Sequence, residues 1–416
     1  ADIHLDSPLR SLALRNPDLA DLIGNATRRA FVRIVDLCLD EQVDALLLAG
    51  DLYDGEQTSM KTARFLAEQI RRLHEASIRV FVIRGNHDAL SRITKELVFP
   101  DSVKVFGGRA EAIEVGRARG DFPVVIHGLS FAQPHAADSL IGKYKPLVEG
   151  AVNIGILHTS LAGAPGHDLY APCSLADLHA TGFRYWALGH VHMRSVTEGN
   201  CTIVMPGMPQ GRDISEAGPK SVTLVTVADD RSIRIEERIT SIAQFERVSI
   251  DATGVDNWRD LVAALARAME RAREGFASEH LVARLRLTGK TPLAWRIRRD
   301  LDLLKTEADE RASMIGACWV EKLEVDCQPP GAAAGSPIDP ISELRRLIDE
   351  EVIRSEAYQV EVTKIAEELR AQLPQDCRIL LGSDEAAFKA AIALLVQEGA
   401  DEVLARLHAG ADVGES

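Results

Sequence analysis

Five short segments contain the residues best suited to chemistry. They are D-x-H at Asp2 and His4, G-D-x-x-D at 50–54, G-N-H-D at 85–88, His158, and G-H-x-H at 189–192. Mixed carboxylate, amide and imidazole donors suit divalent ions such as Mn, Fe or Zn. Two such ions a few Å apart can clamp a phosphoryl group and activate a bound water. That arrangement needs a shared anionic ligand, and Asp51, on a turn after an apolar run, is the natural bridge.

These segments differ in how strongly they indicate a site. D-x-H and H-x-H are frequent by chance, and a single histidine such as His158 is more often a packed side chain than a ligand. G-N-H-D is much rarer, and all five segments in this order favour a metal site over packing. The remaining histidines of this part of the chain match none of the segments, so we interpret them as surface or core residues: His127, His135, His167 and His179.

The elements around these segments predict how they are positioned. Short β-prone runs occur at 45–49, 80–83, 124–126, 154–157, 185–188, 203–205 and 222–227. Amphipathic patterns predict helices between them, one after a cap at Asn25 and another from Met60 to His74. This alternation is typical of a layered α/β domain, which binds ligands at the carboxyl ends of its strands.

Composition changes along the chain predict four parts. Residues 1–244 form the α/β domain, and residues 245–327 follow with a strand–helix–strand–helix–strand pattern. Residues 328–337 are a linker rich in Pro, Gly and Ala, and residues 338–416 are helical. Asp339 followed by Pro340 predicts the start of this helical tail. Its apolar stripes include Leu344, Leu347 and Ile348.

The overall composition is that of a globular protein, with 46% hydrophobic and 26% charged residues. No apolar run is long enough to span a membrane, and the first residues do not have the pattern of an export signal. The six cysteines show no C-x-x-C spacing, which indicates reduced thiols. We therefore expect a cytoplasmic protein without a membrane partner.

The charge distribution bears on nucleic-acid binding. A formal net charge of -14 is unfavourable, because affinity for phosphates depends on Lys and Arg. However, 17 acidic and 8 basic residues lie in 338–416, so the acidity is concentrated in the tail. One stretch has six basic residues and no acidic one: Arg284, Arg286, Lys290, Arg296, Arg298 and Arg299. It is either a track for DNA phosphates with Trp295 as a stacking ring, or a solvated face with Trp295 in the core.

The five segments, in this order, resemble the signature of the calcineurin-like metallophosphoesterases over about the first 210 residues. The stretches 1–9 and 205–212 are similar to those of bacterial YhaO-type and SbcD-type DNA repair exonucleases. The resemblance implies an α/β fold, a layered sandwich of two β-sheets flanked by helices. It also implies a small α+β capping domain that binds DNA and a helical C-terminal tail.

The resemblance also implies roles for individual residues. One metal would be held by Asp2, His4, Asp51 and His192, and the other by Asp51, Asn86, His158 and His190. His87 would act on the scissile phosphate or the leaving oxygen without binding a metal, which suits an imidazole near neutral pH. Asp88 would orient the His87 ring, although a helix cap is the alternative.

Two features depart from the family. A β-strand normally precedes D-x-H, whereas only Ala1 stands before Asp2 here. Either native residues precede Ala1 or the sheet lacks a strand, and the positions of Asp2 and His4 depend on which is true. Asp54 is acidic, as in bacterial members, where some archaeal and eukaryotic relatives have histidine. We therefore assign Asp54 no contact with DNA.

Motifs and resemblance together predict a two-metal phosphodiesterase, using Mn or else Fe, Zn or Mg, that acts as a DNA exonuclease in repair. One alternative is a phosphoesterase acting on nucleotides or phosphoproteins, and another is a non-catalytic scaffold. The resemblance implies two partners, DNA and an SMC-like coiled-coil ATPase held by Leu344, Leu347 and Ile348. The tail would otherwise dock on the capping domain or self-associate in a homodimer.

Overall fold

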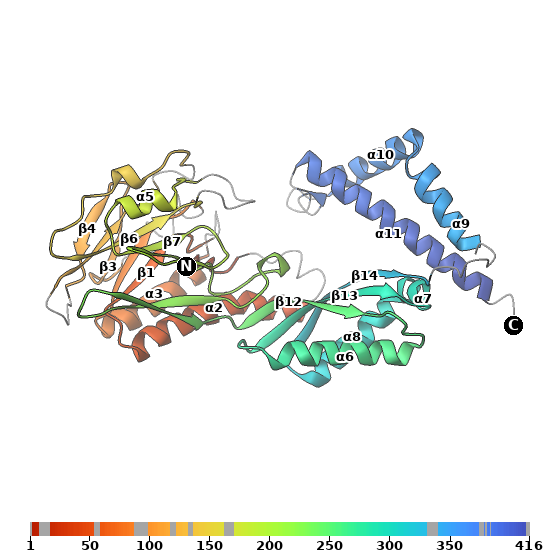
Figure 1. Cartoon of the computed structure of the whole chain (residues 1–416), viewed down its shortest axis with the longest axis horizontal. Helices are drawn as coiled ribbons and strands as arrows, with labels where there is room; N and C mark the ends of the chain where they lie inside the picture. Colours follow the sequence, from red (N-terminus) through yellow and green to blue (C-terminus); the bar gives the residue numbers. More distant parts are fainter. Residues whose placement is uncertain are drawn as a thin grey trace. The chain divides into compact units, whose positions relative to one another are not determined.

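The computed structural model describes residues 2–7, 17–53, 59–86, 99–116, 122–131, 136–161, 170–330, 340–373, 378, 381–382 and 384–412. The chain divides into two units (Figure 1). The first contains Ala1–Glu246 and Phe276–Val282, and the second contains Arg247–Gly275 and Ala283–Ser416. The predicted tail therefore belongs to the same unit as most of the predicted capping domain.

Two β-sheets build the first unit. The smaller has the parallel order β1 (Ala45–Ala49), β2 (Arg79–Ile83), β3 (Val103–Val105). The larger has the order β4 (Glu111–Glu114), β5 (Val124–Gly128), β6 (Val152–His158), β7 (Tyr185–Gly189), β9 (Thr202–Met205), β8 (Ser195–Thr197). Its central strands β5, β6, β7 and β9 are parallel, and the edge strands β4 and β8 are antiparallel to their neighbours.

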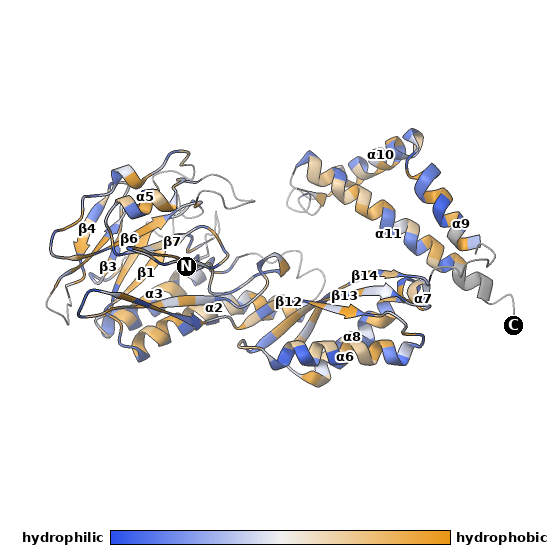
Figure 2. Cartoon of the chain, viewed as in Figure 1, coloured by the Kyte–Doolittle hydropathy of each residue, from blue (hydrophilic) through white to orange (hydrophobic). Residues whose placement is uncertain are grey.

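The sheets pack face to face and helices cover their outer faces. Phe81 and Ile83 of β2 share one buried cluster with Ile154 of β6. On the smaller sheet, α2 (Pro17–Asp40) and α3 (Met60–Glu75) bury their apolar stripes, for example Phe31. On the larger sheet, α5 (Leu175–Ala180) packs Leu178 into a cluster with Trp186. The predicted sandwich of two sheets flanked by helices is confirmed, and apolar residues concentrate on its strands (Figure 2).

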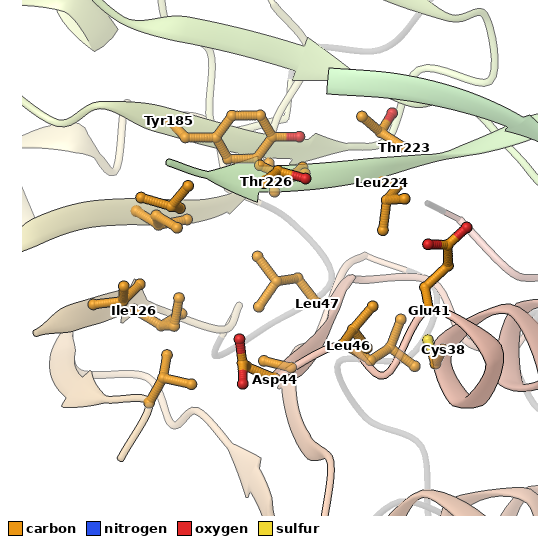
Figure 3. Close-up of a pocket in the computed structure, with 18 of the residues that line it drawn as sticks. Cys38, Glu41, Asp44, Leu46, Leu47, Ile126, Tyr185, Thr223, Leu224 and Thr226 are labelled. Atoms are coloured by element: carbon orange, nitrogen blue, oxygen red, sulfur yellow. The ribbon is translucent and has the colours of Figure 1, made fainter. Parts of the chain in front are cut away.

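A hairpin of β10 (Ser221–Val227) and β11 (Ile233–Ile239) completes this unit, with short 3-10 turns at η1 (Ile141–Lys143) and η2 (Ile214–Glu216). A cavity of about 480 Å³ lies between the hairpin, β1 and the end of α2. Figure 3 shows Leu46 and Leu47 on one side of it and Thr223 and Leu224 on the other. None of the predicted metal ligands lines this mostly apolar cavity, so it is separate from the candidate site.

The predicted start of the first helix is wrong. Asn25 lies inside α2, where its side-chain amide donates to the Asp21 carbonyl at 2.9 Å. The helix begins at Pro17, and proline is well tolerated in a first turn because its missing N–H would have no partner within the helix there. A residue of a type that favours caps is therefore used here as an ordinary helical residue.

A three-stranded sheet has the order β12 (Ala243–Asp251), β13 (His280–Lys290), β14 (Cys318–Gln328), and most of its residues belong to the second unit. Helices α6 (Trp258–Glu274), α7 (Ala294–Arg299) and α8 (Leu301–Ile315) alternate with these strands. The Asn257 side chain caps α6 by accepting the N–H of Asp260. This is the predicted strand–helix–strand–helix–strand order, with the second helix divided between α7 and α8.

The tail consists of α9 (Pro340–Leu347), a π-helical turn η3 (Ile348–Val352), α10 (Glu356–Gln372) and α11 (Glu385–Asp412). Helix α11 packs on α7 through Leu404 and Ala405, which bury Trp295. Leu344 and Ile348 lie partly buried against the same cluster. The tail therefore docks within its own unit. In the described part of the chain, no helix has the length and apolar character needed to cross a membrane.

Candidate metal centre

The ends of four strands position the predicted ligands. Asp51 follows β1, Asn86 follows β2, His158 is the last residue of β6, and His190 follows β7. The ligand atoms of Asp51, His158 and His190 lie within 4.8 Å of one another, and all three residues are buried. Strand ends that are distant in sequence thus bring three metal-binding groups to one point.

Asn86 joins this group. Its Oδ1 lies 2.9 Å from His158 Nε2 and 3.2 Å from His190 Nδ1. Asp51 Oδ2 lies 3.3 Å from His158 Nε2. Asp51, Asn86, His158 and His190 are the four residues expected to hold one metal, and we call them the inner site.

The N-terminal segment completes a second group without being part of a sheet. The backbone N–H groups of Ile3 and His4 donate to the Asp51 carbonyl, each at 3.0 Å. The His4 Nε2 atom then lies 3.1 Å from His192 Nε2. We call His4 and His192, together with Asp2 and the shared Asp51, the outer site. The His192 side chain is 24% exposed, so solvent can reach this group.

Asp2 has a structural contact as well as a predicted metal-binding role. Both of its carboxylate oxygens accept the backbone N–H of His190, at 3.0 Å each. Its own N–H donates to the Gly207 carbonyl at 3.2 Å. Asp2 therefore holds the G-H-x-H turn in place as well as facing the site.

Hydrogen bonds fix which nitrogen of His158 and which nitrogen of His192 faces the centre. His158 Nδ1–H donates to the Ala49 carbonyl at 2.9 Å, so Nε2 points to Asp51 and Asn86. His192 Nδ1 lies 2.9 Å from Glu216 Oε1, and this bond directs its Nε2 to His4. Histidine ligands of metals commonly donate their other ring N–H to a carbonyl or carboxylate in this way.

The electrostatics of the centre favour a cation. Burial lowers the pKa of His158, but the Asp51 and Asp2 carboxylates outweigh this effect and raise the pKa to about 9. A proton on Nε2 thus offsets surplus negative charge. A divalent ion bound by these groups would displace that proton, because metal ligands must be deprotonated. The donor set and its charge therefore fit a divalent metal.

Three motif glycines allow the close packing of these ligands. A Cβ atom at Gly50 would lie 2.4 Å from His158 Nδ1, and one at Gly85 would lie 2.3 Å from Asp51 Oδ1. At Gly189 it would lie 2.2 Å from the Ala49 carbonyl oxygen. The neighbouring His190 has a φ of 99°, a region that costs a non-glycine residue about 1–3 kcal/mol. The surrounding structure must stabilise this conformation.

Comparisons with known proteins agree with this geometry. Residues 1–194 match the calcineurin-like phosphoesterase model, and residues 245–328 match the model of the middle domain of metallophosphoesterase YhaO. The chain is 31% identical to the uncharacterized metallophosphoesterase YhaO of Bacillus subtilis over 293 residues, 70% of this chain and 71% of that protein. This chain belongs to the calcineurin-like phosphoesterases.

Two further relatives of this calcineurin-like phosphoesterase are DNA double-strand break repair proteins named Mre11. The protein from Sulfurisphaera tokodaii is 23% identical over 359 residues, 78% of this chain and 85% of its own. The protein from Haloferax volcanii is 25% identical over 386 residues, 87% of this chain and 78% of its own. These similarities extend well beyond the five motifs.

Membership of this family establishes the class of reaction. The chain is a metallophosphoesterase, and its fold uses divalent metal ions for hydrolysis of phosphoester bonds. The donors of the inner and outer sites are the residues that would hold such ions. His87 and Asp88, as well as Asp54, lie outside the described residues.

Two residues that support the centre, Glu216 and Arg212, were not predicted from the sequence. Glu216 contacts His192, and Arg212 contacts Glu216 at 2.6 Å. Burial would raise the pKa of Glu216, but His192 and Arg212 hold it well below its usual range. The stretch 205–212 drew attention by its resemblance to exonucleases, but no motif spacing indicated Glu216.

The other histidines lie away from the centre where they are described. His127 is fully buried on β5, with Nε2 2.8 Å from Asn153 Oδ1 and its ring against Phe183. His179 is in α5. These placements fit the packing interpretation. His135 and His167 lie outside the described residues.

The basic stretch of the second unit is largely neutralised. Its arginines form ion pairs with acidic residues: Arg284 with Glu321 and Glu324, Arg286 with Asp326, Arg296 and Arg299 with Asp300, and Arg298 with Asp401. Among the described residues, Lys290 makes no ion pair. Trp295 is 6% exposed and packs under α11, so the interpretation of it as a stacking ring is wrong.

Proposed function

We propose that this phosphoesterase is a two-metal-dependent phosphodiesterase that acts as an exonuclease in DNA repair. The observation that carries the proposal is the extent of the similarity to the Mre11 proteins, which covers 78% of the chain in one case and 87% in another. The phosphoesterase motifs alone need only the first half of the chain. The similarity therefore extends beyond the catalytic domain, into the part of the chain for which we propose DNA binding.

The proposed ligands are those of the two sites. Asp2, His4, Asp51 and His192 would hold one ion, and Asp51, Asn86, His158 and His190 the other. Bound ions of this kind, for which we propose Mn, polarise a phosphate and lower the pKa of a water molecule. In the chain itself, Asp2 orients the His190 turn and the Ala49 carbonyl orients His158.

His87 would stabilise the leaving oxygen or donate a proton to it, and Asp88 would orient its ring. Replacement of His87 with Ala should leave metal content unchanged and lower turnover by about 10²- to 10⁴-fold, the usual contribution of a general acid. Metal analysis beside kinetics tests this. Loss of metal equal to that of His190→Ala would make His87 a ligand instead.

The decisive experiment offers the purified full chain labelled single-stranded and double-stranded DNA, together with a chromogenic phosphodiester. Each substrate is tested with Mn, with Mg and without metal. The proposal requires metal-dependent release of nucleotides from DNA ends. Hydrolysis of the small phosphodiester without DNA cleavage would contradict the nuclease while leaving the phosphoesterase intact.

A second candidate is a phosphoesterase that acts on nucleotides or phosphoproteins. The net charge of -14 favours it, because a strongly acidic chain repels the DNA backbone. The experiment above separates the two when nucleotides and a phosphopeptide are added as substrates. Preference for these over DNA would support the second candidate.

For a protein partner, we propose an SMC-like coiled-coil ATPase that docks on the tail. Leu344 and Ile348, expected to hold it, pack instead against the chain's own Trp295 cluster. Exposed apolar residues remain on α10 and α11: Val360, Ile365, Leu369, Leu394 and Leu395. Deletion of residues 338–416 should abolish capture of the ATPase and preserve hydrolysis of the small phosphodiester. A tail that instead mediates homodimers would change the oligomeric state without an ATPase.

A further inference from the structure

Glu216 lies behind the outer site and joins three groups. Its side chain, 8% exposed, ends the short η2 turn. Oε1 accepts the Nδ1–H of His192 at 2.9 Å and a bond from the Arg212 guanidinium at 2.6 Å. Oε2 accepts the backbone N–H of Arg212 at 2.8 Å. A buried carboxylate with this many donors is held in one orientation.

Arg212 extends the contact to the N-terminal segment. Its Nη1 donates to Ser7 Oγ at 3.1 Å. Asp6, beside Ser7, accepts two bonds from Arg28, at 2.6 and 2.5 Å, and one from the Thr62 hydroxyl. The segment that carries His4 and the turn that carries His192 are therefore connected through Arg212 and Glu216. At the inner site, the group that accepts the Nδ1–H of His158 is the Ala49 main-chain carbonyl.

We infer that Glu216 and Arg212 are positioning residues that set the metal affinity of the outer site. The carboxylate holds the Nδ1–H form of His192, so Nε2 keeps its lone pair directed toward His4, and it makes that nitrogen a stronger donor. Arg212 keeps the carboxylate oriented and ties it to Ser7. The inference rests on the proposed two-metal centre.

The difference between the two sites makes the inference specific. His158 of the inner site is oriented by the Ala49 main-chain carbonyl, which a substitution at Glu216 does not alter. The inner site should therefore keep its metal affinity in Glu216 variants. Supporting partners of metal ligands typically contribute about 10- to 100-fold in affinity. Loss of the Glu216 carboxylate should thus separate the affinities of two sites that share Asp51.

The test measures Mn²⁺ binding to the full chain by calorimetry and by electron paramagnetic resonance. Wild type should bind two ions and show the signal of a coupled pair. Glu216→Ala should weaken one ion by about 10- to 100-fold and leave the other within about twofold, giving the signal of an isolated ion at intermediate Mn²⁺. Glu216→Gln, which keeps an acceptor oxygen without the charge, should restore part of the loss.

Asp213→Asn is the matched control. Asp213 caps the same η2 turn through the N–H of Ser215 at 2.7 Å, and its bonds within this turn do not involve His192. This variant should bind both ions like wild type. Equal loss in Asp213→Asn and Glu216→Ala would reduce Glu216 to a support of the turn and overturn the inference. So would equal weakening of both ions, or no change, in Glu216→Ala. A wild type that binds fewer than two ions would refute the two-metal centre itself.

Discussion

The metal centre and the basic stretch are both conspicuous in the sequence, yet the structure uses them in opposite ways. The motif residues of the centre converge, with Asp51, His158 and His190 within one ligand sphere. The basic stretch instead disperses into separate ion pairs, such as Arg284 with Glu321. Motif residues whose positions are fixed by the backbone come together as their spacing in the sequence predicts. Long charged side chains find partners that no local spacing specifies.

The reason is how each side chain is held. His158 and His190 lie at the ends of neighbouring strands. The register of those strands pairs His158 with Gly189 and so fixes the backbone position of both histidines. Arg298, by contrast, meets Asp401 of α11, and Asp401 also meets Arg345 of α9. Those contacts depend on how the tail docks, which a charge count cannot show. The predictions below test this contrast in order of expected effect.

The largest effect should come from Asp51, the ligand shared by both sites. Asp51→Asn removes the bridging charge, so we expect loss of bound Mn and a fall in phosphodiester hydrolysis of at least about 10²- to 10³-fold. Metal analysis and steady-state kinetics measure this. Asp177→Asn, which changes an exposed carboxylate that caps α5 in the same unit, should retain both metal and activity. Retained metal in Asp51→Asn would show that the sites do not depend on a bridge.

The backbone itself should matter almost as much. In Gly189→Ala the new Cβ would lie 2.2 Å from the Ala49 carbonyl oxygen, and neither main chain can move aside without shifting β1 or β7. We expect a loss of about 1–3 kcal/mol in stability, as for an overpacked core, together with weaker Mn binding. Urea unfolding of the metal-free protein measures the first.

Gly142→Ala is the control for that substitution, since its Cβ would meet nothing within 4 Å. Its stability should stay within about 0.5 kcal/mol of wild type. If Gly189→Ala is equally harmless, the motif glycine is not required for the approach of the ligands, and the contrast with the basic stretch loses its physical basis.

Much of the fold follows from sequence pattern, and the exceptions have physical causes. The seven β-prone runs all lie in strands, because short apolar runs bounded by turn residues, most of them containing Val or Ile, favour strands. Asn25 misled because a cap residue is also tolerated inside a helix. Glu216 was missed because its contact with His192 is tertiary and its local sequence is that of an ordinary turn.

A smaller effect should come from the ion pairs that fasten the tail. Asp401 is 20% exposed and meets Arg298 at 3.3 Å and Arg345 at 2.5 Å. Asp401→Ala leaves Arg298, which is 10% exposed, without this partner, so we expect a local loss of about 1–3 kcal/mol. Faster hydrogen exchange in α7 and α11 would report it. Asp326→Ala, which breaks an exposed pair with Arg286, should change exchange little.

The smallest effect concerns DNA binding by the basic stretch. We predict that replacing Arg286, Lys290 and Arg296 with Ala reduces the slope of log affinity against log salt by about 1. Each phosphate contact normally contributes about 1, but Arg286 and Arg296 already pair with Asp326 and Asp300, so only Lys290 can bind without giving up an ion pair. Arg298 is left intact because it fastens the tail.

A matched triple variant at exposed tail cations, Arg346, Lys364 and Lys389, should leave the slope unchanged. An unchanged slope in the first variant would assign DNA binding to another surface. A drop of about 3 would mean that DNA displaces the internal acidic partners, so that the charge run in the sequence, and not its pairing in the structure, describes the bound state.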